Sequence, residues 1–231
     1  MQPKEDKNCY ASPEQRSVLI KLIENNLLDN DFFLTGGTAL AVFYLHHRTS
    51  NDLDLFTTQH VDLSEIDFTV KTLWQKNYRK LRDSQTFLSL LLQNVKVDFA
   101  IDPLSINETR PRYQLEPDVY LQIDSISNIL SNKLTALASR TEPKDFVDFY
   151  HLCKSFEATR FEVVYEAARK KDAIFDDPPT VAYQIEEGLQ FVLSNINVLP
   201  PLKIEFEEEK FTEFYHKVIS WIYSKGKPKS K

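Results

Sequence analysis

The chain of 231 residues is 42% hydrophobic and 27% charged, as expected for a globular protein of one large domain or two small ones. Its net charge of −6 excludes a protein that coats nucleic acids through a generally basic surface. An RNA substrate could still bind to a local basic surface. Two cysteines, Cys9 and Cys153, are too few for a disulfide scaffold or a thiolate metal site.

The N-terminal segment has no apolar run behind its first residues, so we expect no secretory signal. No apolar stretch approaches the ~20 residues that a membrane span needs. We therefore expect a cytoplasmic protein with no membrane partner. Ser12, Pro13 and Gln15 then have the spacing of an N-cap, a first-turn proline and a capping-box partner, which predicts a helix from residue 13.

The periodicity of residues 31–101 predicts alternating strands and helices. The expected elements are a strand at 31–35, a helix at 38–46, a strand at 52–56, a helix at 63–76, and strands at 78–83, 86–92 and 95–101. This half of the chain is therefore predicted to form a mixed layer of about four or five strands with flanking helices.

From Asp124 onward the apolar residues follow helical spacing. We expect helices from residue 126 and at 143–156, 160–171, 180–195 and 207–225. The predicted fold class is α+β, with an α/β domain at residues 1–123 and a helical domain at 124–231. A cleft between the two domains is the natural place for a site.

Gly36 and Gly37 are adjacent in a chain that holds only four glycines, where average usage would give about sixteen. They lie at a predicted strand-to-helix turn, and Thr38 adds a hydroxyl group. Bare backbone N–H groups at such a turn favour a phosphate. A tight turn alone is the commoner explanation of a glycine pair.

Asp52 and Asp54 alternate with leucines on the next predicted strand, so both carboxylates face one side. Carboxylates this close repel one another unless a cation lies between them, and Mg²⁺ prefers such hard oxygen ligands. Asp98, on a later predicted strand, would be a third ligand. An Asp-x-Asp strand alone is more often an exposed polar face, but a preceding glycine turn makes a metal site beside a triphosphate site the better interpretation.

Residues 34–40 read Leu-Thr-Gly-Gly-Thr-Ala-Leu, and residues 48–56 read Arg-Thr-Ser-Asn-Asp-Leu-Asp-Leu-Phe. A second block reads Asn-Lys-Leu-Thr-Ala-Leu at 132–137 and Lys-Asp-Phe-Val-Asp-Phe-Tyr at 144–150. Together these motifs resemble the AbiEii-type nucleotidyltransferases, toxins of bacterial abortive-infection and toxin–antitoxin systems. The resemblance spans about half of the chain and implies the nucleotidyltransferase-type mixed sheet.

The resemblance implies a role for each matching residue. Asp52, Asp54 and Asp98 would hold Mg²⁺ or Mn²⁺, and the nucleotide would be bound by Gly36, Gly37, Thr38, Arg48, Ser50 and Lys133. Lys133 would bind the triphosphate, although on its own it is a common surface lysine on a helix packed by leucines. Asp145 would activate the acceptor as a general base. Asp148, three residues on, is the alternative acid, and Arg140 would brace one of the two.

The implied reaction moves NMP from an NTP to an acceptor hydroxyl, on a tRNA 3′ end or a protein, and a cognate antitoxin protein is an expected partner. Basic clusters at 79–82, 110–112 and 225–231 are candidate RNA contacts. The alternatives are an antibiotic-modifying nucleotidyltransferase and a non-catalytic nucleotide-binding regulator. His46 and His47 have no acid or third histidine at ligand spacing and are interpreted as a helix cap rather than as metal ligands.

Overall fold

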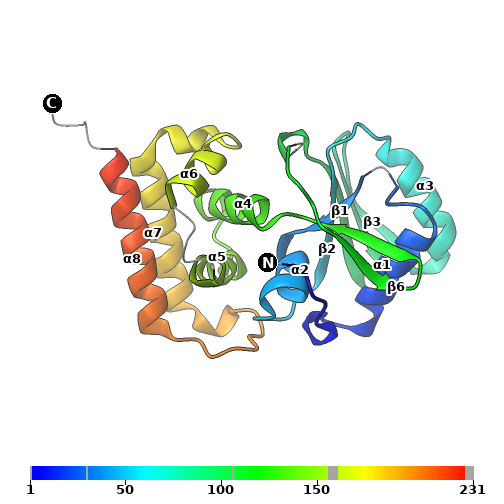
Figure 1. Ribbon diagram of the computed structural model, residues 1–231, viewed down its shortest axis with the longest axis horizontal. Coiled ribbons are helices and arrows are strands. Elements are labelled where there is room, and N and C mark those ends of the chain that lie inside the picture. Colours follow the sequence, from blue (N-terminus) through cyan, green and yellow to red (C-terminus); the bar gives the residue numbers. More distant parts are fainter. Residues whose placement is uncertain (1, 30, 106, 156–160, 227–231) are drawn as a thin grey trace. The chain divides into compact units, whose positions relative to one another are not determined.

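The computed structural model describes residues 2–29, 31–105, 107–155 and 161–226 (Figure 1). The chain divides into two compact units, Met1–Ile126 and Ser127–Lys231. The first unit is built on a β-sheet and the second is helical.

The sheet of the first unit is mixed and has seven strands in the order β3-β4-β5-β2-β1-β7-β6. The strands are β1 (Phe33–Thr35), β2 (Asp52–Thr57), β3 (Tyr78–Asp83), β4 (Phe87–Leu92), β5 (Val95–Ile101), β6 (Arg112–Glu116) and β7 (Val119–Ile123). β2 runs parallel to β5, and β1 runs parallel to β7, whereas the other neighbours are antiparallel. The central strands β2, β1 and β5 are thereby brought side by side.

Helices of the first unit cover the sheet and the turn after β1. They are α1 (Pro13–Glu24), α2 (Gly36–Leu40), a π-helical turn η2 (Ala41–Leu45) and α3 (Leu63–Trp74), with short 3₁₀ turns η1 (Lys7–Cys9), η3 (Gln75–Asn77) and η4 (Pro103–Ser105). Figure 1 shows α1 and α3 on the same side of the sheet. Leu19 and Leu22 of α1 and Val70 of α3 are fully buried there, because apolar residues recur at helical spacing.

Seven strands exceed the four or five that the sequence predicted, and the difference is the β6–β7 hairpin. Its turn holds Pro117 and Asp118, and Asp118 adopts φ 61°, in the left-handed region where aspartate is tolerated. β6 is an edge strand whose side chains are mostly polar, so its signal is weak. Val119, Leu121 and Ile123 of β7, however, alternate in the buried positions expected of a strand.

The helix predicted at 38–46 begins two residues earlier, at Gly36, and changes to a π-helical turn at Ala41. The backbone N–H of His46 donates to the carbonyl of Ala41, which is the i→i−5 bond of a π-helix. His46 itself then ends the helix in the left-handed region, at φ 54°. Widened turns of this kind place a side chain where a regular α-helix would not.

The second unit contains α4 (Ile126–Ser139), α5 (Pro143–Ser155), α6 (Phe161–Arg169), η5 (Ala173–Asp176), α7 (Pro178–Ser194), η6 (Ile196–Val198) and α8 (Glu208–Lys225). These agree with the predicted helices to within about two residues. The predicted end at Phe156 and start at Arg160 lie outside the described residues. The basic cluster at 225–231 also extends beyond them.

Aromatic rings from α5 and α8 form the core of the second unit. Phe146, Phe149 and Tyr150 are at most 5% exposed. Tyr215 of α8 donates its hydroxyl to the Phe146 carbonyl at 2.7 Å, so the buried phenol is satisfied. None of the helices in the described ranges is both long and apolar enough to cross a membrane.

Candidate active site

Three acidic side chains lie together at the centre of the sheet. Asp52 and Asp54 are two residues apart on β2 and therefore face the same side. The parallel pairing of β2 with β5 places Asp54 directly opposite Asp98. Pairing across strands thus brings the third carboxylate to the Asp-x-Asp pair, although the ligand atoms of the three do not all lie within 4.8 Å of one another.

Lys96 carries a positive charge into this cluster and was not among the predicted site residues. Its Nζ donates to Asp98 Oδ2 at 2.6 Å and lies 4.0 Å from Asp52 Oδ2. Partial burial by itself lowers the pKa of Lys96, but the hydrogen bond to Asp98 and the charges of the acids outweigh it, so the pKa is raised. The ammonium group therefore offsets part of the negative charge of this acidic cluster.

Asp98 is fixed from a second direction by Ser89 on β4. The Ser89 hydroxyl donates to Asp98 Oδ1 at 2.5 Å, and both residues are buried. Asp98 therefore has both carboxylate oxygens occupied, one by the hydroxyl and one by Lys96. A metal ion that bound Asp98 would replace the Lys96 ammonium group and leave the Ser89 contact in place.

The two glycines permit close approach of the site side chains to the backbone. Gly36 has φ +67°, and a Cβ there would lie 2.1 Å from Asp54 Oδ2. A Cβ on Gly37 would lie 2.4 Å from Arg48 Nη2 and 3.1 Å from Ser50 Oγ. The glycine turn is therefore next to one of the carboxylates, to the guanidinium and to the serine, which is the neighbourhood that a metal-bound triphosphate would need.

Thr38 and Ser50 lie in a buried hydrogen-bond network under the turn. Their hydroxyl groups are bonded at 2.9 Å, and Thr38 also bonds to the main-chain carbonyl of Asp52. Gln15 of α1 donates from Nε2 to the Thr38 hydroxyl at 3.2 Å and to the Asp52 carbonyl at 3.1 Å. Thr38 is 0% exposed, so its hydroxyl group serves the position of Asp52.

Gln15 was expected to complete a capping box with Ser12, and this expectation is wrong. The Ser12 side chain makes no capping hydrogen bond, and Gln15 Oε1 accepts from the backbone N–H of Ala11 at 2.9 Å instead. Gln15 is 1% exposed, and its side-chain amide donates to the Thr38 hydroxyl and to the Asp52 carbonyl. Gln15 therefore supports the site, a role that the capping pattern in the sequence did not indicate.

Arg48 is 2% exposed, although a guanidinium group is rarely buried without partners. Its Nη1 donates to the carbonyl of Thr49 at 2.8 Å, and its Nη2 lies beside Gly37. This place at the glycine turn is compatible with the phosphate contact that the resemblance implies for Arg48.

The second unit holds the other predicted residues in one buried ion cluster. Lys133 of α4 places Nζ 2.7 Å from Asp145 Oδ1 and 2.6 Å from Asp148 Oδ2, both on α5. Arg140 adds a contact from Nε to Asp145 Oδ2 at 2.8 Å. Both carboxylates are 0% exposed and Lys133 is 6% exposed, so the interpretation of Lys133 as a surface lysine is wrong.

Burial acts on the Asp145 pKa in one direction and its partners act in the other. Removal from water raises the pKa of Asp145, but Lys133 and Arg140 lower it by charge and by hydrogen bonds, and the net shift is downward. Asp145 is therefore ionised near neutral pH, with one oxygen on each cation. A carboxylate held in this way is suited to orienting Lys133.

The predicted residues thus fall into two groups. The first unit contains Gly36, Gly37, Thr38, Arg48, Ser50, Asp52, Asp54 and Asp98, and the second contains Lys133, Arg140, Asp145 and Asp148. Sequence reasoning missed Gln15, Ser89 and Lys96. A signal existed for Lys96, because it stands two residues before Asp98 on a predicted strand and must share its face.

Comparison with known proteins identifies the family of the chain. Residues 18–214 match the family model described as nucleotidyl transferase AbiEii toxin, type IV toxin–antitoxin system. The chain therefore belongs to this family of nucleotidyltransferase enzymes, as the motifs predicted.

A curated relative, the uncharacterized protein aq_aa25 of Aquifex aeolicus (strain VF5), is 30% identical over 141 residues. The match covers 61% of this chain and 66% of that protein, so it spans slightly less than two thirds of the relative's length.

Two solved structures share the fold across nearly the whole chain. JHP933 from Helicobacter pylori is 16% identical with a TM-score of 0.56, over 96% of this chain and 95% of that one. MenT4, the nucleotidyltransferase toxin Rv2826c from Mycobacterium tuberculosis H37Rv, is 15% identical with a TM-score of 0.55, over 90% and 81%. These likenesses confirm the predicted mixed sheet with flanking helices and a C-terminal helical region.

Proposed function

We propose that this enzyme moves NMP from an NTP to an acceptor hydroxyl group with the help of Mg²⁺ or Mn²⁺. The observation that carries the proposal is the placement of Asp54 opposite Asp98, beside Asp52 and next to the Gly36 turn. Carboxylate oxygens are the hard donors that a divalent ion takes, and the contacts of Lys96 with Asp98 and Asp52 support an attraction of this cluster for positive charge. Bound there, the ion would neutralise charge on the phosphates.

The residues of the first unit then have distinct tasks. Asp52, Asp54 and Asp98 would hold the ion, while the Gly36–Gly37 backbone, Arg48 and Ser50 would bind phosphate oxygens. Thr38 and Gln15, whose polar groups are buried, would hold the Asp52 backbone in place. This division assigns Thr38 to positioning rather than to direct contact with the nucleotide.

In the second unit, we assign Lys133 to the triphosphate and Asp145 to the orientation of Lys133. The resemblance implied acceptor activation by Asp145, with Asp148 as the alternative acid, but both carboxylates are buried and bonded to Lys133. A group with no exposed surface and with cations on its oxygens is a poor acceptor of a further proton. Arg140 supports the same carboxylate from the other side.

The acceptor in this proposal is the 3′ end of a tRNA, with a protein hydroxyl group as the alternative. Because the family comprises toxins of type IV toxin–antitoxin systems, we also infer a cognate antitoxin protein as a partner. The antibiotic-modifying alternative gains no support from the site, because cationic Lys133 and Arg140 do not suit a cationic drug.

The test is to incubate the protein with each α-labelled NTP and Mg²⁺, together with total tRNA, a protein lysate or an aminoglycoside. We expect label to enter tRNA with release of pyrophosphate, and no label with Asp54→Asn. Label in protein would mean that a protein, and not tRNA, is the acceptor. Label in the aminoglycoside would support the antibiotic-modifying alternative. Transfer that persists without a divalent ion would overturn the metal-dependent reaction.

A further inference from the structure

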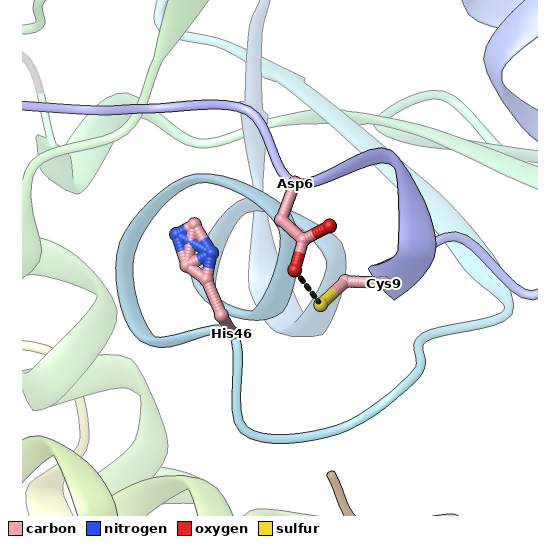
Figure 2. A group of neighbouring side chains, drawn as sticks. All are labelled: Asp6, Cys9 and His46. Atoms are coloured by element: carbon pink, nitrogen blue, oxygen red, sulfur yellow. Dashed lines mark hydrogen bonds between the residues drawn. The ribbon is translucent and has the colours of Figure 1, made fainter.

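A second group of ligand-type side chains lies in the first unit, outside the carboxylate cluster. Asp6, Cys9 and His46 each offer one ligand atom, and these atoms all lie within 4.8 Å of one another. Figure 2 shows the Asp6 carboxylate and the Cys9 thiol facing one another, with the His46 ring on the other side of Asp6. Among the described residues no other set of three histidine, cysteine or acidic side chains meets this distance.

The three residues come from two segments, the η1 turn and the end of η2, which main-chain hydrogen bonds hold together. Asp6 precedes the η1 turn, Cys9 ends it, and His46 follows η2. The N–H groups of Lys4 and Asp6 donate to the carbonyls of Phe43 and Val42, both at 2.8 Å. The N-terminal segment is therefore fixed along η2 by main-chain bonds, which keep the backbones of the three ligand residues close together without an ion.

Each side chain is presented in a conformation that suits coordination. Asp6 uses Oδ1 to accept from the backbone N–H of Asn8 at 3.0 Å, which leaves Oδ2 facing Cys9 Sγ at 3.6 Å. His46 takes the left-handed conformation at the end of a π-helical turn, an uncommon choice for a residue other than glycine. Such turns and strained positions concentrate at functional sites.

We propose that Asp6, Cys9 and His46 bind one Zn²⁺ ion, with water as the fourth ligand. A thiolate, an imidazole and a carboxylate are the ligands that Zn²⁺ takes in proteins, whereas Mg²⁺ prefers oxygen alone. Around a tetrahedral zinc ion the ligand atoms lie about 3.5 Å apart. The Asp6–Cys9 spacing of 3.6 Å already meets this, and His46 reaches it by rotating its ring.

When the ion binds, it takes the place of the hydrogen atom between Cys9 Sγ and Asp6 Oδ2. The S–H bond breaks, its proton goes to solvent, and Sγ and Oδ2 both bond to Zn²⁺. Cys9 is 0% exposed, whereas Asp6 and His46 are partly exposed, so the ion would be reached from their side and the open position would face solvent. We call the Asp6, Cys9 and His46 site the clamp, because the ion would join the N-terminal segment to the end of η2.

The clamp is connected to the candidate active site through Ser50. The Ser50 N–H donates to the Cys9 carbonyl at 3.0 Å, and the Ser50 carbonyl accepts from Ala11 at 3.2 Å. Zn²⁺ at Cys9 would therefore stabilise the segment that carries one of the proposed phosphate contacts. This role is separate from the Mg²⁺ site, which contains no sulfur.

The test is a titration of the full chain with Co²⁺, which reports a sulfur ligand through a thiolate-to-cobalt absorption band. We expect the band to saturate at one Co²⁺ per chain and to disappear when Zn²⁺ is added. His46→Asn and Asp6→Asn should each weaken Co²⁺ binding by tenfold or more, because each removes a ligand. Asparagine at position 46 tolerates the left-handed conformation, and asparagine at position 6 can still accept from the Asn8 N–H, so neither change should disturb the backbone. Cys9→Ser should abolish the band.

Matched controls are Cys153→Ser and His60→Asn, which should leave the band and its stoichiometry unchanged. Ions bound only by Asp52, Asp54 and Asp98 give no sulfur band, so the outcome is independent of the proposed transferase reaction. The site is wrong if no band appears, or if the band survives both Cys9→Ser and His46→Asn. If Cys9→Ser does not fold, His46→Asn and Asp6→Asn still decide.

Discussion

Asp54 is the residue on which the proposed metal chemistry most depends, because it lies opposite Asp98 and against Gly36. We expect Asp54→Asn, like Asp52→Asn, to abolish Mg²⁺-dependent transfer. The free energy of unfolding should be unchanged or slightly higher, since one charge of a repelling group is removed. Labelled-NTP transfer and chemical denaturation measure the two effects. Wild-type transfer by either variant would disprove the metal assignment.

Lys96 competes with a metal ion for Asp98 and Asp52, so its removal should favour the ion. Lys96→Met is expected to lower the half-saturating Mg²⁺ concentration by up to about fivefold, the equivalent of the ~0.2–1 kcal/mol of a partly exposed ion pair. Lys80→Met is the matched control, because Lys80, on β3, pairs with Asp67 and Asp83 and not with the acids of the candidate site. A higher Mg²⁺ requirement in Lys96→Met would mean that the lysine helps to assemble the site.

These residues differ in how far the sequence could reveal them. Asp52, Asp54 and Asp98 were predictable, because alternation on a strand fixes the face of each side chain. Lys96 followed from the same rule and was overlooked. Gln15 could not have been found, since its partner carbonyl on Asp52 lies 37 residues away and is reached only through the packing of α1 on the sheet.

At the scale of elements, α4 and α5 are joined by the buried contacts of Lys133 with Asp145 and Asp148. Lys133→Met should lower the free energy of unfolding by about 3–5 kcal/mol, because it removes the Lys133 ammonium group from two buried carboxylates, of which Asp145 keeps Arg140. Lys217→Met is the control. Lys217 makes an exposed pair with Glu213, so the change should be within about 0.5 kcal/mol. Thermal and urea unfolding compare the two variants.

The same cluster should make stability depend on pH. The pKa of Asp145 is lowered in the folded protein, chiefly by Lys133 and Arg140 acting against burial. Its contribution is therefore fully present above the unfolded-state value of about 3.9 and is lost as pH falls through the folded-state pKa. Urea unfolding between pH 7 and pH 3 should show a steeper loss for the wild type than for Asp145→Asn. Equal slopes would contradict the ion-paired state.

Element prediction was most reliable where periodicity was long and unbroken. The helices of the second unit carry several turns of apolar spacing, and their predicted bounds agree closely with the structure. The β6–β7 hairpin was missed because each strand has five residues and β6 alternates polar side chains at a sheet edge. The π-helical turn at Ala41–Leu45 has no pattern in the sequence, since it depends on one widened hydrogen bond.

For the whole molecule, charge distribution constrains how an RNA acceptor can bind. The basic clusters of the first unit are largely used within the protein. Arg110 pairs with Asp124 and stacks on Phe33, while Arg112 lies over Tyr120. With a net charge of −6, the chain cannot rely on general attraction to phosphates. If a tRNA is the acceptor, as proposed, we expect it to be bound through few phosphate contacts.

Salt dependence tests this last inference. Affinity for a single-stranded acceptor falls with salt with a logarithmic slope of about −0.7 for each phosphate neutralised. We expect two or three such contacts, so the apparent affinity for tRNA should fall with a slope no steeper than about −2. The measurement is the tRNA concentration for half-maximal transfer at several salt concentrations, with Mg²⁺ and NTP saturating. Arg79 and Arg82 are exposed on β3, and their change to alanine should flatten the slope if they supply the contacts. A slope near −4, equivalent to about six phosphates, would instead require an extended basic surface for the acceptor.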